Sequence, residues 1–187
     1  YHKGEWLEEK SLPLRYSGVS SCFRKEAGKH GKDVWGIFRV HQFEKVEQFV
    51  ICEGDLDVSN AMQEEMSKAA EEFYQSLGFP YQVINIVSGA LNNAAIRKFD
   101  IECWFPGYNE YKELVSCSNC TDYQSKKVNL KYKDNNSGYV HMLNSTLCAN
   151  TRTMCCLLET YQQPDGIIIP EVLKKYMNGI EFIEFKN

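Results

Sequence analysis

The sequence has little of what marks membrane proteins and the common nucleotide-binding folds. None of its apolar runs is long enough to span a bilayer, and no basic-then-apolar leader opens the chain. We therefore expect a protein of the cytoplasm with no membrane partner. Glycine-rich phosphate loops and a regular alternation of strands with helices are also missing. A nucleotide site in this chain must therefore be built in another way.

Strong positive charge is absent as well. The formal net charge of −4 argues against a domain that coats nucleic acid.

A length of 187 residues fits one domain with room for a substantial core. The chain begins at Tyr1 rather than at Met, so we expect an upstream part to be missing.

Cysteine is plentiful, yet without a leader the eight cysteines indicate a reducing compartment rather than disulfides. Cys117 and Cys120 form a Cys-x-x-Cys motif, for which zinc binding and redox chemistry are alternatives to simple burial. Zinc would need a second pair of ligands, and a redox motif would need a strand–helix–strand context. The sequence offers neither, so buried thiols are the preferred interpretation.

The order of apolar patterns predicts an α+β domain with an antiparallel sheet flanked by helices. Aromatic and β-branched residues indicate strands at 19–26, 36–50, 81–87, 99–105, 111–117, 128–132, 139–143 and 167–169. Helical spacing indicates helices at 61–77, 149–161 and 170–176. The Pro106–Gly107 step predicts a hairpin between two of the strands.

The helix at 61–77 carries one apolar stripe that we expect to face the core. Asn60 is the candidate cap, and Gly78 ends the helix. The stripe consists of Met62, Met66, Ala69, Phe73 and Leu77.

Charged and aromatic side chains are expected to share one face of the first two strands. Arg39, Phe43 and Glu47 are at odd positions of the strand 36–50, and Arg24 and Glu26 share a face of the preceding strand. Arginine suits phosphate, an aromatic face suits adenine, and a carboxylate suits an ammonium group. The alternative to a binding site is that these side chains form a row of surface ion pairs, such as Arg39 with Glu47.

Two further places offer chemistry. Glu113 and Ser116 provide the hard oxygen ligands that suit Mg²⁺, but in a flat strand they face opposite ways, so a bulge, or an ion held at the strand edge, would be needed. Arg152 lies in the first turns of the helix at 149–161, where the helix dipole disfavours a cation. Its place makes sense if it holds a polyphosphate there.

These motifs together resemble seryl-tRNA synthetases of the eukaryotic cytosolic kind, which are class II aminoacyl-tRNA synthetases. The resemblance covers nearly the whole chain in order. It rests on the residues Ser-Cys-Phe-Arg-Lys-Glu-Ala-Gly at 21–28, Arg-Val-His-Gln-Phe-Glu-Lys-Val-Glu-Gln-Phe at 39–49, Glu-Leu-Val-Ser-Cys-Ser-Asn-Cys-Thr-Asp at 113–122, Asn-Ser-Thr at 144–146, Thr-Arg-Thr at 151–153 and Leu-Glu-Thr-Tyr-Gln at 158–162.

The resemblance implies that residues 1–187 are the class II catalytic fold from its motif 2 to the C-terminus. Motif 1, a Thr-x-Glu serine loop and the N-terminal tRNA-binding arm would lie upstream. The implied reaction is ATP-dependent activation of serine to seryl-adenylate, followed by transfer to the 3′ end of tRNA(Ser), in a protein that is a homodimer at full length. The alternatives are an ATP- or adenylate-binding fragment without turnover and a synthetase-like paralogue with a non-catalytic role.

The resemblance also implies a role for each site residue. Arg24, Arg39 and Arg152 would be the catalytic cations. Arg24 would contact the α-phosphate, Arg39 the γ-phosphate, and Arg152 both the β- and γ-phosphates. The other ATP-binding residues would be Glu26, Val40, Phe43, Glu113, Leu114, Val115 and Ser116, with Phe43 stacking on adenine and with Glu113 and Ser116 holding Mg²⁺. Serine would be bound by Arg24, Glu47, Asn144 and Thr146. Trp35 departs from the family pattern, which usually has arginine there.

Overall fold

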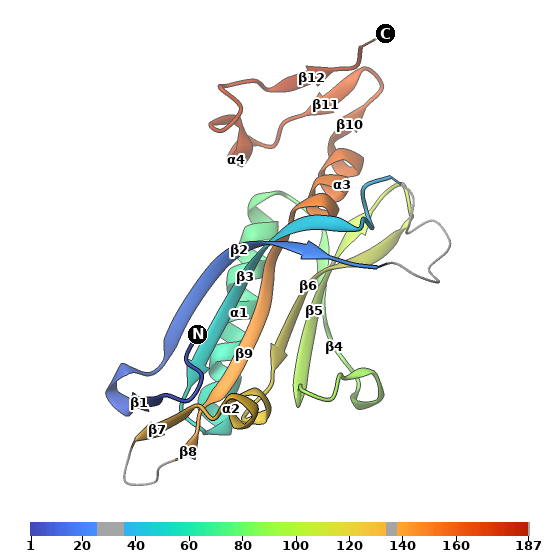
Figure 1. Ribbon diagram of the computed structural model, residues 1–187. Helices are drawn as coiled ribbons and strands as arrows, with labels where there is room; N and C mark the ends of the chain where they lie inside the picture. The colour runs from blue at the N-terminus through green and yellow to red at the C-terminus, as the bar shows by residue number, and fades with distance from the viewer. Residues whose placement is uncertain (26–35, 134–137, 187) are drawn as a thin grey trace.

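A six-stranded antiparallel sheet forms the body of the protein in the computed structural model, which describes residues 1–25, 36–133 and 138–186 (Figure 1). Its strands lie in the order β2-β3-β9-β6-β5-β4. The strands are β2 (Leu14–Phe23), β3 (Gln42–Cys52), β4 (Tyr81–Asn85), β5 (Arg97–Phe105), β6 (Glu110–Asn119) and β9 (His141–Ala149). The predicted α+β fold and the hairpin at Pro106–Gly107, which joins β5 to β6, are confirmed.

Two helices cover one face of this sheet: α1 (Leu56–Ser76) and α3 (Asn150–Tyr161). Buried side chains from α1 pack with Val50, Cys117 and Leu143 of the central strands. A second core joins both helices to the hairpin of β5 and β6 through residues that include Tyr74, Phe105 and Cys156. Because side chains alternate along a strand, the opposite face of the sheet is left for a site.

Helix α1 starts earlier than the sequence pattern indicates. Asp55, not Asn60, caps it, because its carboxylate accepts hydrogen bonds from the amides of Asp57 at 2.8 Å and Val58 at 3.0 Å. The end is as predicted, since Gly78 follows the helix with φ +73. Ala69 is exposed, contrary to the predicted stripe. The buried face instead carries Ser59, Gln63, Met66, Ser67, Ala70 and Tyr74.

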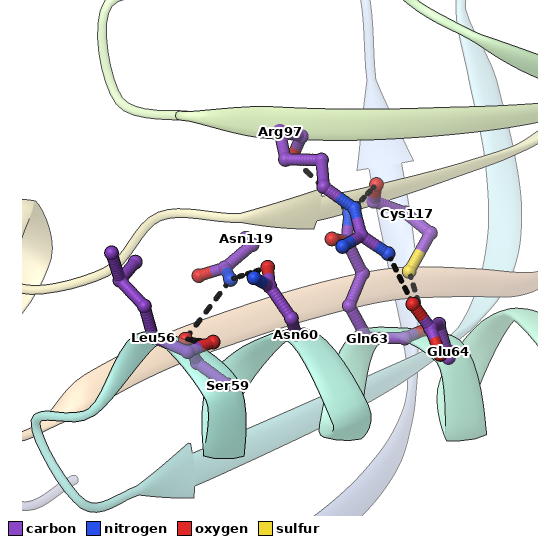
Figure 2. A network of polar contacts seen from close by, with 8 residues as sticks. All are labelled: Leu56, Ser59, Asn60, Gln63, Glu64, Arg97, Cys117 and Asn119. Carbon is purple, nitrogen blue, oxygen red and sulfur yellow. Dashed lines mark hydrogen bonds and ion pairs between the residues drawn. The ribbon is translucent and has the colours of Figure 1, made fainter.

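Polar groups on that helix face are satisfied by the sheet (Figure 2). The Gln63 side-chain amide donates to the carbonyls of Arg97 at 3.1 Å and Cys117 at 3.0 Å. Asn119 donates to the hydroxyl of Ser59 at 3.1 Å. A period that counts only apolar residues misses these polar positions, although four residues of the predicted stripe do pack in the core: Met62, Met66, Phe73 and Leu77.

Smaller elements lie at both ends of the sheet (Figure 1). The predicted strand at 128–132 is wrong, because α2 (Tyr123–Val128) ends there and only β7 (Lys131–Lys133) follows. β7 pairs with β1 (Trp6–Glu8) and β8 (Gly138–Tyr139). Beyond α3, β10 (Gln162–Gln163), β11 (Gly166–Ile168) and β12 (Phe182–Glu184) form a third sheet, beside a helix, α4 (Glu171–Lys174), shorter than predicted. Short 3₁₀ turns occur at Glu9–Ser11 and Ser88–Ala90.

None of the helices in the described part of the chain combines the length and the apolar character needed to cross a membrane.

Candidate functional site

A cavity of about 140 Å³ opens on the face of the sheet that α1 leaves free. The segments around it come from β3, β6 and β9, from the start of α3, and from Arg24, Phe38 and Val40 between β2 and β3. Its lining consists of Arg24, Phe38, Val40, Phe43, Lys45, Glu113, Leu114, Ser116, Thr146, Ala149, Thr151 and Arg152. Most of the residues singled out from the sequence therefore meet in one place, including the guanidinium-bearing Arg24 and Arg152.

The bulge that Glu113 and Ser116 require is present in β6. Ile101 pairs with Val115, but the next residue, Glu102, pairs with Glu113, so Leu114 is an extra residue. The extra residue reverses the alternation of the strand, and Glu113 therefore faces the same side as Ser116. The condition set by the sequence analysis is confirmed.

A second bulge shapes the neighbouring strand β9. Val46 pairs with Cys148 and Glu47 pairs with Thr146, which leaves Leu147 as the extra residue. Leu147 packs against the core, while Thr146 and Ala149 line the cavity. The bulge thus places the Thr146 hydroxyl directly opposite Glu47.

Arg24 follows β2 rather than lying within it, yet it stays attached to the opposite strand. Its amide donates to the carbonyl of His41 at 2.8 Å. Its guanidinium lies 4.9 Å from the centre of the Phe43 ring. This cation–π contact holds the charge at the end of the cavity where β3 begins.

Arg152 is the third residue of α3, as the sequence predicts. Its guanidinium donates to the carbonyl of Glu113 at 2.9 Å and lies 4.8 Å from the centre of the Phe38 ring. Phe38 is only 5% exposed and packs edge-on against Phe105, with ring centres 5.3 Å apart. Phe38 therefore connects the hydrophobic core to a site cation, a role that sequence reasoning missed although an aromatic directly precedes Arg39.

Glu47 is held by two residues of the cavity wall. The ammonium of Lys45 lies 2.6 Å from Glu47 Oε2, and the Thr146 hydroxyl donates to the same oxygen at 3.2 Å. Glu47 and Thr146, both predicted to bind serine, are therefore in contact. Lys45 also donates to the Thr146 hydroxyl at 3.4 Å, and the sequence analysis overlooked it.

Comparison with protein families places residues 1–161 in the tRNA synthetase class II core domain (G, H, P, S and T). The chain belongs to this family.

Individual relatives agree with the family. The chain is 60% identical over 190 residues to the cytoplasmic serine–tRNA ligase of Dictyostelium discoideum, covering 99% of this chain and 42% of that protein. Identity to the Saccharomyces cerevisiae enzyme of the same name is 56% over 195 residues, covering 100% of this chain and 42% of the relative. The chain thus spans less than half of the length of these relatives.

Two solved structures are also similar over the whole chain. The cytoplasmic serine–tRNA ligase of Naegleria fowleri, in complex with AMP, has a TM-score of 0.95 and 57% identity, and this chain covers 45% of it. The seryl-tRNA synthetase of Pyrococcus horikoshii, complexed with ATP, has a TM-score of 0.93 and 47% identity, and this chain covers 42% of it. The class II fold expected from the resemblance is confirmed.

Some predicted positions of the class II site lie elsewhere. The expected strand at 36–50 begins only at Gln42, so Arg39 lies in a bend before β3 and not on the same strand as Phe43 and Glu47. The side chain of Val115 is fully buried on the helix side. Glu26 and Trp35 lie outside the described residues.

Asn144 lines a second cavity, of about 380 Å³, with Ser118, Cys120 and Tyr123. Its amide donates to the Cys120 sulfur at 3.7 Å. It shares a face of β9 with Thr146, two residues further along, so its assignment to serine stays a prediction.

The Cys-x-x-Cys motif of the synthetase core is divided between two environments. Cys117 faces α1 and donates to the carbonyl of Gln63 at 3.6 Å, and burial raises the pKa of its thiol to about 11. Cys120 receives the Asn144 amide, and burial raises the pKa of this thiol also. Both thiols are therefore protonated at neutral pH. No group of three or more His, Cys, Asp or Glu suited to a metal ion occurs among the described residues.

Proposed function

We propose that the chain carries the nucleotide- and serine-binding part of a serine–tRNA ligase. The observation that supports this most is the cavity in which the Arg24 guanidinium lies on Phe43 of β3 and in which Thr146 of β9 contacts Glu47, further along β3. Phosphate, adenine, an ammonium group and a hydroxyl each find a matching partner there. The names of the relatives and the AMP and ATP complexes of the similar structures point in the same direction.

The proposed reaction has two steps. An oxygen of the serine carboxylate attacks the α-phosphorus of ATP, the bond to the bridging oxygen breaks, and pyrophosphate leaves. A hydroxyl of the terminal ribose of tRNA(Ser) then attacks the carbonyl carbon of the adenylate, taking the seryl group and releasing AMP.

The protein supplies position and charge for this chemistry rather than a nucleophile. Bringing two anions together requires cations around the reacting centre. Arg24 and Arg152 line the cavity and provide that charge. Glu47 holds the serine ammonium, while the Thr146 hydroxyl opposite Glu47 reads the serine hydroxyl. A pocket that hydrogen-bonds a hydroxyl disfavours alanine, because polar groups of the protein would then remain unpaired.

Glu113 and Ser116 fit a magnesium ion that accompanies ATP. The bulge at Leu114 brings a carboxylate and a hydroxyl to one side of the cavity, and Mg²⁺ is usually held by one or two carboxylates together with substrate phosphates. When bound, the ion would neutralise charge on the phosphates.

The setting of the enzyme follows from the same proposal. We infer a cytoplasmic protein that uses ATP, Mg²⁺, serine and tRNA(Ser) and that is a homodimer at full length. Arg39 and Glu26 are the remaining candidates for phosphate, adenine or acceptor-end contacts, with Val40 and the Leu114–Val115 backbone beside the nucleotide.

A second candidate is binding without turnover. It is favoured by the fact that the chain spans only about 42% of the length of the relatives named above. In that case the chain would bind ATP or a seryl-adenylate analogue and would release no pyrophosphate.

Pyrophosphate exchange into ATP separates these candidates. The full-length protein that contains this sequence should exchange pyrophosphate when serine is present, and threonine or alanine should not replace serine. Binding of a non-hydrolysable seryl-adenylate analogue, measured by calorimetry on the same sample, serves as the control. Analogue binding without exchange would favour the second candidate, and exchange with alanine but not serine would refute the proposal.

A further inference from the structure

Lys45 lies in the middle of the site, and no role above depends on it. It projects into the cavity from β3, between Phe43 and Glu47, and its ammonium contacts Glu47 Oε2 at 2.6 Å and the Thr146 hydroxyl at 3.4 Å. The side chains of Lys45 and Glu47 are 28% and 15% exposed. A lysine that is mostly shielded from water in a substrate cavity calls for an explanation beyond a surface ion pair.

The position of Lys45 along the strand matches the reacting centre, an argument that rests on the proposed function. Residues on one face of a strand follow each other at about 7 Å. Phe43 lies at the adenine end and Glu47 at the amine end, so Lys45 lies at the level between them. In seryl-adenylate, the anhydride of phosphate and carboxyl group joins these two ends.

Lys45 and the substrate compete for the same carboxylate. Lys45 and Thr146 both contact Oε2 of Glu47, at 2.6 and 3.2 Å. A serine ammonium that arrives at Glu47 would stand beside the lysine ammonium, and like charges at such separation repel. The lysine side chain is long and flexible, so its ammonium can move while the backbone of β3 stays in place.

We propose that Lys45 is a resident counter-ion of Glu47 that is displaced by the substrate amine and then contacts the anionic reacting centre. In the empty site it keeps the Glu47 carboxylate paired and in position. When serine binds, the ammonium of serine takes its place on Glu47, and Lys45 moves to the carboxylate of serine and the α-phosphate of ATP. Lys45 is then a catalytic residue that acts beside Arg24.

Serinol tests this exchange of partners, because it has the amine and hydroxyl of serine but a second hydroxymethyl group in place of the carboxylate. In the unsubstituted protein serinol must displace Lys45 without offering it an anion, so serinol should bind weakly. In Lys45→Met the carboxylate of Glu47 is vacant, and serinol should bind about tenfold more tightly by calorimetry, a change of about 1.4 kcal/mol. The same variant should lose about 10²–10³-fold in kcat of serine-dependent pyrophosphate exchange, as expected when one group that stabilises transition-state charge is removed.

Lys98→Met is a matched control. Lys98 also lies two residues before its carboxylate partner on one strand, at 3.3 Å from Asp100, but it does not line the cavity. Its loss should lower stability without changing the ratio of serine to serinol affinity. Lys45→Arg, which keeps the charge, should recover part of the exchange rate, and Lys45→Gln replaces Lys45→Met in the binding test if the methionine variant does not fold.

The outcomes separate this inference from the proposed function. Absence of serine-dependent exchange in the unsubstituted full-length protein would reject the proposed function. If that exchange is present but Lys45→Met weakens serine and serinol alike, Lys45 is a structural residue and the inference is wrong. Opposite changes for the two ligands would support the exchange of partners.

Discussion

Replacing Phe38 tests the connection between the core and the site cations. Phe38 is 5% exposed, contacts the ring of Phe105, and lies under the Arg152 guanidinium at 4.8 Å. Phe38→Leu keeps most of the apolar volume but removes the aromatic face. A swap of similar volume costs less than about 1.5 kcal/mol of unfolding free energy.

The expected effect on ATP binding follows from the lost cation–π contact. Such a contact is worth about 0.5–2 kcal/mol, depending on how far it is shielded from water. At about 1.4 kcal/mol for each factor of ten, Kd for ATP should rise about 2- to 30-fold. The loss should fall on Arg152, so Phe38→Leu and Arg152→Lys together should weaken binding by less than the product of their separate effects.

The assay combines urea unfolding with calorimetric titration of ATP on the full-length protein. Phe79→Leu is the control, because Phe79 is 4% exposed in the same core and stacks on Tyr74, away from the site cations. It should lower stability by a similar amount and leave the Kd for ATP unchanged. Equal weakening of ATP binding in the two variants would refute the reasoning, since it would show a general loss of packing.

Three further predictions follow from other contacts. Arg24→Ala should reduce serine-dependent pyrophosphate exchange by at least about 10²–10³-fold. The unfolding free energy should change by less than about 1 kcal/mol, because the Arg24 side chain faces the cavity rather than the core. Exchange at the wild-type rate would show that Arg24 does not contact the reacting groups. Burial lowers the pKa of His141 below its ordinary value of 6.5, so the unfolded chain binds more protons below about pH 6.5 and stability should fall as the pH drops. Urea unfolding at about pH 7.5 and about pH 5.5 should show a smaller drop for His141→Asn, and equal drops would contradict this cause. Gln63→Ala should lower the unfolding free energy by about 1–3 kcal/mol, because the Cys117 carbonyl loses a buried donor, and an unchanged urea midpoint would argue against that hydrogen bond.

Most of the residues singled out from the sequence line one cavity, because their types are specific and several of them share one strand. Phe43 and Glu47 share β3 as their spacing predicts, and Arg152 lies in the first turn of α3 as predicted. The need for a bulge between Glu113 and Ser116 could be inferred from the sequence, but its position could not, because no local sequence signal shows which residue is the extra one.

Other features depended on contacts between distant segments. The predicted start of the strand at residue 36 was wrong, because residues 36–41 include strand-forming side chains but form turns and bends in which Phe38 is buried, and tertiary packing overrides local propensity. The polar face of α1 was invisible to an apolar count, since Gln63 and Ser59 are buried only because the sheet supplies their partners. Lys45 was overlooked because its contact with Thr146 depends on the bulge in β9, which places Thr146 opposite Glu47.

The strand order of the main sheet has a consequence for how the protein emerges from the ribosome. β3 and β6 are neighbours only through β9, which is the last of the six strands to be synthesised. A nascent chain that has been made up to β6 thus contains Phe43 and Glu113, but it lacks the strand β9 that lies between β3 and β6 in the sheet. Pairing between strands that are far apart in the sequence is slow to form. Nucleotide affinity should therefore arise abruptly once β9 has been made and paired, which makes ATP binding a reporter of the completed six-stranded sheet rather than of the early stages of folding.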